Sequence, residues 1–216
     1  MMAPLGPRVP QRGNAFSRGL GRLVLRLMGW RVDGGVPDAP KMVLIGAPHT
    51  TNMDGVIAFA ILISLGIRAS TMIKDSAFRG FGGVVLRWLG AVPVNRKSPK
   101  GVVEQSVDAF NDNPQFVLLL APEGTRSAPK AWKRGFHHVA YGAGVPIVAA
   151  AIDYQRKLVT FGPPLQPTSD YEADVGKLQD YVAAHSSPRH AERLSKPIAD
   201  RQGRPWSGGG GSSSED

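Results

Sequence analysis

The sequence predicts an α/β fold with a mainly parallel or mixed central sheet flanked by helices, together with an N-terminal amphipathic helix. From residue 41 onward, apolar segments rich in β-branched residues alternate with segments of helical period, which is the pattern of successive βαβ units. The chain has 216 residues, of which 42% are aliphatic or aromatic, and this is enough to bury the core of one such domain. We expect that domain to span residues 38–200.

The first two predicted segments precede this domain. Residues 1–13 contain three prolines and two glycines, which predicts a disordered arm. Residues 14–32 form a predicted membrane-associating unit, a helix over 15–32 with arginine at every fourth position on one face. Another face carries its apolar residues, Leu20, Leu23, Val24, Leu27 and Trp30. Trp30 stands where an interfacial anchor would place it, although an ordinary helix packed on the core with its arginines in water has the same pattern.

The remaining elements follow in alternation. Strands are predicted over 42–47, 70–74, 91–94, 116–120, 146–152 and 157–161, and helices over 53–65, 81–89, 101–111, 132–143 and 169–184. The longest apolar run, residues 56–67, has 12 residues and is too short to span a bilayer, so we expect a buried helix there and no transmembrane segment. No secretory signal is recognisable. The Gly/Ser-rich residues 204–216 are predicted to form a flexible tail.

Composition narrows the classes of function. The chain has no cysteine, which excludes thiol catalysis, disulfides and cysteine metal sites. Its net charge of +9 favours anionic partners such as a phospholipid surface, a nucleotide or a nucleic acid. Nucleic-acid binding is disfavoured, because the basic residues are spread over many elements and no helix-turn-helix, zinc or aromatic RNA-binding motif is present. The histidines at 137, 138, 185 and 190 lack the spacing of a helical metal pair, so no metal site is predicted.

His49 and Asp54, in the stretch GAPHTTNMDG, form the first candidate site. On one continuous helix, a separation of five residues would leave the two side chains about 140° apart. If residues 42–47 are a strand and the helix begins after His49, the loop can bend the imidazole back over the first helical turn. The stretch then supplies a histidine–carboxylate pair at the exit of a strand, where active groups gather in parallel sheets.

Two further strand exits carry charged residues. Arg96 follows the predicted strand 91–94 and offers a planar guanidinium suited to phosphate, although a surface arginine after a strand would have the same pattern. Glu123 and Arg126 follow the strongly apolar strand 116–120, and we expect both to be displayed on the surface of a tight turn that contains proline and glycine. A turn with a local Glu–Arg ion pair is the alternative interpretation there.

Taken in order, these segments resemble the glycerolipid acyltransferase family of the 1-acylglycerol-3-phosphate O-acyltransferase type. The first block of the family, N-H-x-x-x-x-D-like, is matched by His49 and Asp54, and its second block, which ends in arginine, by VPVNR at 92–96. The third block, E-G-T-R-S, is matched identically by residues 123–127. The fourth is matched by VPIVA at 145–149.

The resemblance implies roles for individual residues. His49 would be the general base that takes a proton from an acceptor hydroxyl, and Asp54 would hold its ring tautomer and stabilise the imidazolium. The implied substrate-binding residues are Lys74, Arg96, Glu123, Gly124, Thr125 and Arg126. Among these, the arginines and the lysine would contact the acceptor phosphate, and the glutamate and glycine would shape the acceptor pocket.

The resemblance also implies the reaction. The chain would move a fatty acyl group from a thioester, acyl-coenzyme A or an acyl carrier protein, to a hydroxyl of a lysophospholipid, above all 1-acylglycerol-3-phosphate, in phospholipid biosynthesis. The thioester would be a co-substrate, and no cofactor would be bound. We expect a peripheral protein at the cytoplasmic face of a membrane, with anionic lipid and acyl carrier protein as partners and no nucleic acid. The alternatives are another lipid acceptor within the family and a non-enzymatic basic protein of the membrane surface.

Overall fold

The computed structural model describes residues 5–74, 90, 92–94 and 101–208, with the backbone alone at 72–74 and 93–94. Within these residues the centre is a six-stranded sheet with the strand order β1-β8-β7-β2-β6-β3. Its strands are β1 (Arg31–Asp33), β2 (Lys41–Ala47), β3 (Ala69–Ser70), β6 (Phe116–Leu120), β7 (Ile147–Asp153) and β8 (Leu158–Phe161). The strands β4 (Met72–Lys74) and β5 (Val92–Val94) form a separate parallel pair.

Most neighbouring strands of the central sheet are parallel. β2 pairs in parallel with both β6 and β7, whereas β7 and β8 pair antiparallel. The sheet is therefore mixed and mainly parallel, which confirms the predicted α/β fold. In the register of the sheet, Ile45 lies opposite Leu120 and Ala47 lies opposite Ala151. The carboxyl ends of β6, β2 and β7 consequently lie side by side at the same end of the sheet.

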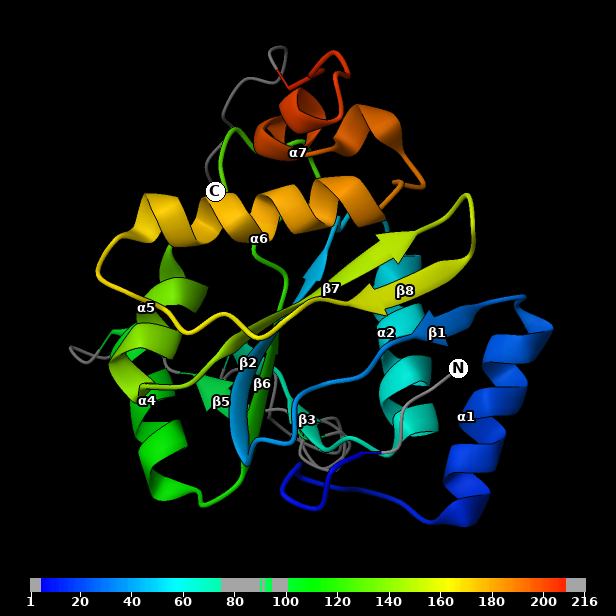
Figure 1. Cartoon of the computed structure of the whole chain (residues 1–216), viewed down its shortest axis with the longest axis vertical. Helices are drawn as coiled ribbons and strands as arrows, with labels where there is room; N and C mark the ends of the chain where they lie inside the picture. Colours follow the sequence, from blue (N-terminus) through cyan, green and yellow to red (C-terminus); the bar gives the residue numbers. More distant parts are fainter. Residues whose placement is uncertain (1–4, 75–89, 91, 95–100, 209–216) are drawn as a thin grey trace.

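Helices cover both faces of the sheet. The helices α1 (Ala15–Leu27) and α2 (Asn52–Leu65) lie on one face, and α4 (Val102–Asp112), α5 (Gly135–Ala143) and α6 (Tyr171–His185) lie on the other (Figure 1). A short 3-10 turn (Ala191–Arg193) and α7 (Lys196–Arg201) follow α6. Of the helices in the described part of the chain, none has the length and apolar content needed to cross a bilayer.

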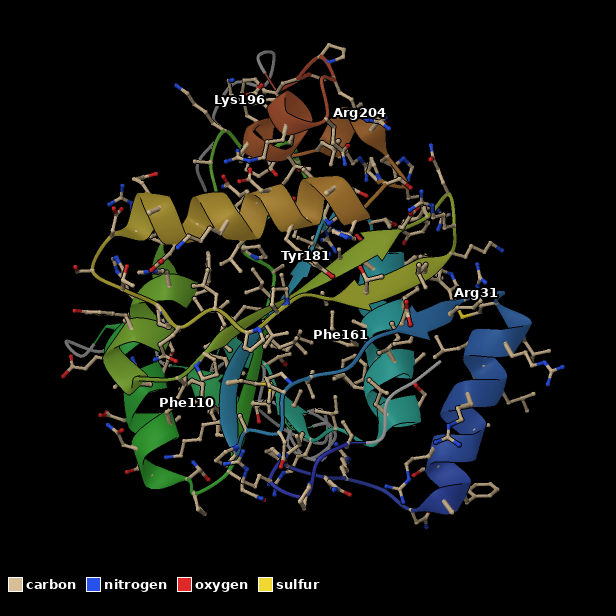
Figure 2. All side chains as sticks on the ribbon, in the orientation of Figure 1. Arg31, Phe110, Phe161, Tyr181, Lys196 and Arg204 are labelled. Carbon is tan, nitrogen blue, oxygen red and sulfur yellow. The ribbon has the colours of Figure 1, made fainter. Side chains whose placement is uncertain are left out.

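The alternation of side chains along β2 supplies residues to both cores. Leu44 packs with α1 and α2, whereas Val43 and Ile45 pack with α4, α5 and α6. Phe110 and Phe161 likewise lie on opposite sides of the sheet (Figure 2). Because both faces are covered, the central strands are continuous apolar runs, and this explains why the sequence shows no polar alternation there.

The predicted elements are found with shifts of a few residues at their ends. The strand predicted over 70–74 is divided between β3 and β4. The helix predicted over 132–143 begins at Gly135. The helix predicted over 81–89 lies outside the described residues. β1 and α7 were not predicted, because elements of three and six residues are too short to show a recognisable period.

The N-terminal helix is shorter than predicted and ends at Leu27. Gly29 has a positive φ of 75°, which turns the chain out of the helix. Trp30 then folds back into the core with only 6% of its surface exposed, and Arg31 begins β1. The prediction that Trp30 anchors the helix at a lipid interface is therefore wrong, since its indole is buried.

Both terminal segments pack more closely than predicted. Residues 5–13, the described part of the arm predicted to be disordered over 1–13, contribute Val9 to the core at 1% exposure. The amide of Arg12 also donates a hydrogen bond of 2.8 Å to the backbone carbonyl just after α2. At the start of the predicted flexible tail, Trp206 packs against the core and its indole donates to the Ala128 carbonyl at 3.2 Å. Apolar side chains bind both segments to the domain despite their turn-forming composition.

Close packing of α1 on α2 leaves one side of α1 exposed. A Cβ atom at Gly21 would lie 2.7 Å from the Ser64 amide nitrogen, so only glycine fits this contact without displacement. Leu25 is buried on the same side. An exposed apolar stripe on another side consists of Phe16, Leu20, Leu23 and Leu27. At 100° per residue these four side chains fall within about 60° of arc, so they form one continuous band along the helix.

Candidate active site

Three loops that follow neighbouring parallel strands form the candidate active site. His49 follows β2, Glu123 follows β6 and Tyr154 follows β7. Because β2 lies between the other two strands, these loops meet at the carboxyl edge of the sheet. The sequence predicted that His49 and Glu123 each follow a strand. The strand order explains why these two residues lie close together, because β2 and β6 are neighbours in the sheet.

The start of α2 brings Asp54 to His49. The helix begins at Asn52, and Asp54 occupies its third position, from which the carboxylate reaches back to the amides before the helix. Its Oδ2 accepts hydrogen bonds from the amides of Thr50 and Thr51 at 2.7 and 2.8 Å. Nδ1 of His49 lies 3.3 Å from the same oxygen. The loop geometry inferred from the spacing of the two residues is therefore present.

Asp54 is buried, and hydrogen bonds keep its carboxylate ionised. Its side chain is 2% exposed, whereas that of His49 is 26% exposed. Tyr154 donates a hydrogen bond to Oδ1 of Asp54 at 2.5 Å. Burial, the largest single influence, raises the pKa of Asp54, but the His49 ring, the Tyr154 hydroxyl and two backbone amides outweigh it and hold that pKa below its ordinary value. The carboxylate faces Nδ1, which leaves Nε2 of His49 as the nitrogen that can accept a proton from a substrate.

Glu123 lies behind the histidine loop. Its side chain is 1% exposed, and Oε2 accepts a hydrogen bond from the His49 amide at 2.5 Å. Oε1 accepts from the Ser195 hydroxyl at 3.1 Å, and the oxygen of that hydroxyl accepts from the Trp132 indole at 3.2 Å. Burial raises the pKa of Glu123 to about 7, although the hydrogen bonds from His49 and Ser195 act in the opposite direction. Glu123 is thus not displayed on its turn, as the sequence suggested, but holds the backbone of the His49 loop.

The turn after Glu123 directs an arginine toward α2. Gly124 has a φ of 66°, a conformation that favours glycine. Thr125 and Arg126 are exposed, and Nη1 of Arg126 donates a hydrogen bond to the side-chain carbonyl of Asn52. Glu123 and Arg126 therefore bind different partners, and the local ion pair considered from the sequence is not formed between these two side chains.

A polar cleft of about 570 Å³ opens beside Arg126. We call it the polar cleft, and its lining consists of Thr51, Asn52, Arg126, Ser127, Ala128, Glu192, Arg193 and Ser207. Arg193 comes from the C-terminal segment, and its Nη1 donates to the Thr50 carbonyl at 3.3 Å. The cleft therefore places two guanidinium groups against the start of α2 and next to the His49 loop.

Tyr154 and Arg193 were not among the predicted site residues. Tyr154 lies two residues after the predicted strand 146–152, so its position at a strand exit was a usable signal. No local pattern marks Arg193, because long-range contacts of the C-terminal segment bring it to the site. One of these contacts is the hydrogen bond of 3.1 Å that the Ala128 amide donates to the Arg193 carbonyl.

Two predicted phosphate contacts are not placed by the structure. Arg96 lies outside the described residues, and Lys74 ends β4, where the backbone alone is described. Both stay predictions. Within the segments that the structure describes, no group of three His, Asp or Glu side chains is arranged to hold a metal ion.

We expect Glu123→Gln to remove part of the pH dependence of folding stability. The folded pKa of about 7 lies above the ordinary value of 4.5, so folding takes up a proton between these limits. The contribution of Glu123 to the free energy of unfolding is fully present below pH 4.5 and is lost as the pH rises through 7. At about 1.36 kcal/mol per pKa unit, the full loss is on the order of 3 kcal/mol.

Urea unfolding at pH 5 and pH 8 measures this effect. The wild-type protein should lose more stability across the interval than Glu123→Gln, while Glu172→Gln, at a side chain that is 77% exposed, should follow the wild type. Parallel pH curves for the wild type and Glu123→Gln would contradict the prediction.

Comparison with known proteins agrees with this architecture. A family model described as Acyltransferase matches residues 16–153, which include His49, Asp54 and the turn from Glu123 to Arg126. No curated protein gives a significant match. The crystal structure of the 1-acyl-sn-glycerophosphate (LPA) acyltransferase PlsC from Thermotoga maritima is similar in fold, with a TM-score of 0.55 and 15% identity, over 78% of this chain and 76% of that one. Since the family model spans more than half of the sequence, this chain belongs to the acyltransferase family.

Proposed function

We propose that this acyltransferase is a lysophospholipid O-acyltransferase. It would move a fatty acyl group from a thioester donor, acyl-coenzyme A or an acyl carrier protein, to a hydroxyl of the acceptor lipid. The observation that carries the proposal is the contact between the partly exposed imidazole of His49 and the buried carboxylate of Asp54. The pair lies where the carboxyl ends of three adjacent strands meet. The acceptor we favour is 1-acylglycerol-3-phosphate.

The reaction requires a base but no nucleophile from the protein. Nε2 of His49 accepts the proton of the acceptor hydroxyl while the hydroxyl oxygen attacks the thioester carbonyl carbon. The tetrahedral intermediate collapses with cleavage of the carbon–sulfur bond, and the imidazolium returns its proton to the departing thiolate. The products are an ester and a free thiol. Asp54 stabilises the imidazolium between the two proton transfers.

The polar cleft suits the phosphate of the acceptor. Arg126 and Arg193 line it, and guanidinium groups bind phosphate oxygens through paired N–H donors. The start of α2, a helix of 14 residues, adds the positive end of its dipole. We infer further phosphate contacts from Arg96 and Lys74.

The apolar stripe of α1 suits a membrane surface. Phe16 and Leu27 are 80% and 79% exposed, near opposite ends of the helix. Leu20 lines a surface pocket together with Phe59 and Ile63 of α2, so exposed apolar surface continues from one helix to the other. Arg22 and Arg26 of α1 are exposed as well and can meet anionic headgroups beside the stripe, a combination typical of interfacial helices. We infer peripheral association with the anionic, cytoplasmic face of a membrane, where the net charge of +9 also suits an anionic acyl donor.

The His49→Ala variant tests the reaction itself. Loss of the general base should lower kcat/KM by about 100- to 10,000-fold, because proton transfer by a positioned side chain contributes that much. Asp54→Asn should act in the same direction. The measurement is transfer of a radiolabelled acyl group from acyl-coenzyme A to a panel of lysolipids, alongside melting curves of each variant.

His138→Ala is the matched control, because His138 is exposed on α5. Near-wild-type turnover in folded His49→Ala would refute the mechanism. A wild-type protein that sediments with vesicles but acylates no lysolipid would support the alternative of a non-enzymatic membrane-surface protein.

The Arg126→Ala variant tests the phosphate site. Removal of one charge-assisted contact should lower kcat/KM for 1-acylglycerol-3-phosphate by about 10- to 150-fold. An uncharged monoacylglycerol should be affected far less, since it has no phosphate. Arg126→Lys should restore activity only in part, because lysine lacks the paired donors. Arg31→Ala, on the edge strand β1 (Figure 2), is the control for loss of a positive charge.

Equal losses on the charged and neutral acceptors would indicate that Arg126 serves only to brace the start of α2 through Asn52. In that case the melting temperature of Arg126→Ala should fall together with both activities.

The double variant Phe16→Glu/Leu27→Glu tests membrane association. Both side chains are largely exposed, so the fold should be retained, while binding to anionic vesicles should weaken by at least about 100-fold, given about 1.5–3 kcal/mol for each apolar side chain no longer inserted. Co-sedimentation with vesicles containing anionic phospholipid measures the loss. Val102→Glu, at the start of α4 on the other face of the sheet, makes the same kind of change outside the stripe and should bind normally. Unchanged sedimentation of the double variant would mean that another surface meets the membrane.

A further inference from the structure

Tyr154 contacts Asp54 but has no part in the proton transfers of the proposed reaction. Oδ2 of Asp54 is already occupied by two loop amides and by Nδ1 of His49, whereas Oδ1 accepts its hydrogen bond from the Tyr154 hydroxyl at 2.5 Å. Burial, together with the hydrogen bond to Asp54 and the charge of that carboxylate, raises the pKa of Tyr154, so the phenol keeps its proton and serves as a donor. Leaving a buried carboxylate oxygen without a donor is costly. The hydroxyl therefore holds the second oxygen and, together with the loop amides, orients the carboxylate of Asp54 toward the imidazole.

Trp30 in turn holds the ring of Tyr154. The two ring centroids are 5.0 Å apart with the planes at 90°, which is a favourable edge-to-face contact. The turn between β7 and β8 is also fastened to the end of α1 through Lys157, whose Nζ donates to the Met28 carbonyl at 3.1 Å. The Lys157 carbonyl accepts from the Arg31 amide at 2.8 Å. The turn that carries Tyr154 thus has little freedom to move away from Asp54.

We infer that Tyr154 is a positioning residue for acyl transfer: its hydroxyl orients Asp54 toward His49, and Trp30, which lies between α1 and β1, holds its ring in place for this. The inference rests on the proposed function, because the orientation matters only if His49 is the base. Since the hydroxyl acts on Asp54 rather than on a substrate, its loss should lower turnover and leave substrate affinity nearly unchanged.

The Tyr154→Phe variant removes the hydroxyl and keeps the ring against Trp30. We expect kcat to fall by about 10- to 100-fold, with KM for donor and acceptor within about twofold of the wild type. Tyr141→Phe is the control, because Tyr141 lies half-exposed on α5, and it should behave as the wild type. Trp30→Phe should lower kcat as well. The double variant Trp30→Phe/Tyr154→Phe should fall little further than Tyr154→Phe alone, since both changes act through one hydroxyl.

A spectroscopic measurement separates this inference from the proposed function. The imidazole resonances of His49, assigned by their loss in His49→Ala, should move in Tyr154→Phe and stay in place in Tyr141→Phe. If the wild type transfers no acyl group but these resonances still respond, the proposed function fails and the positioning of Asp54 stands. A Tyr154→Phe enzyme with wild-type kcat and unmoved resonances overturns the inference. A fall in activity that only matches a loss of folded protein in the melting curve overturns it equally.

Discussion

A carboxylate buried among apolar side chains is stable only when its oxygens accept enough hydrogen bonds, and Asp54 meets this condition with donors from two separate parts of the chain. The loop between β2 and α2 supplies the amides of Thr50 and Thr51 and the His49 ring. The residue that follows β7 supplies the Tyr154 hydroxyl. Displacing either part would leave one oxygen of the buried carboxylate without its donors. The need to keep these hydrogen bonds fixes the start of α2 relative to the carboxyl ends of β2 and β7. The hydrogen bonds to Asp54 therefore also fix the orientation of the His49 imidazole.

Glu123 imposes a second constraint of the same kind from the other neighbour of β2. Its two carboxyl oxygens bind the His49 amide and the Ser195 hydroxyl, so they attach both the exit of β6 and the C-terminal segment to the histidine loop. The Lys196 amide adds a hydrogen bond to the Pro129 carbonyl at 2.9 Å. His49 is therefore held twice, at its ring by one buried carboxyl group and at its backbone by another. The same attachments make the C-terminal segment a wall of the polar cleft.

Much of the fold and part of the site could be predicted from the sequence, because their physical causes act over a few residues. The apolar runs at 42–47 and 116–120 mark strands buried on both faces, and their alternation with helical segments indicates parallel strands. The spacing of His49 and Asp54 predicted a helix start between them, since a capping carboxylate and the amides it binds are all local. The stripe on α1 also follows from local periodicity.

The sequence by itself thus determined the order of the longer elements, the strand ends that are followed by polar residues and the pairing of His49 with Asp54. Only the tertiary structure decided which side chains turn inward, because burial depends on partners far along the chain. Trp30 looked like an interfacial anchor, yet Gly29 ends the helix and Tyr154 provides a buried partner for the indole. Glu123 looked exposed on its turn, yet Ser195 and the His49 amide take both of its oxygens. Helix capping and periodicity are encoded within a few neighbouring residues, whereas the meeting of three strand exits depends on the order β6-β2-β7, which the packing of the whole sheet determines.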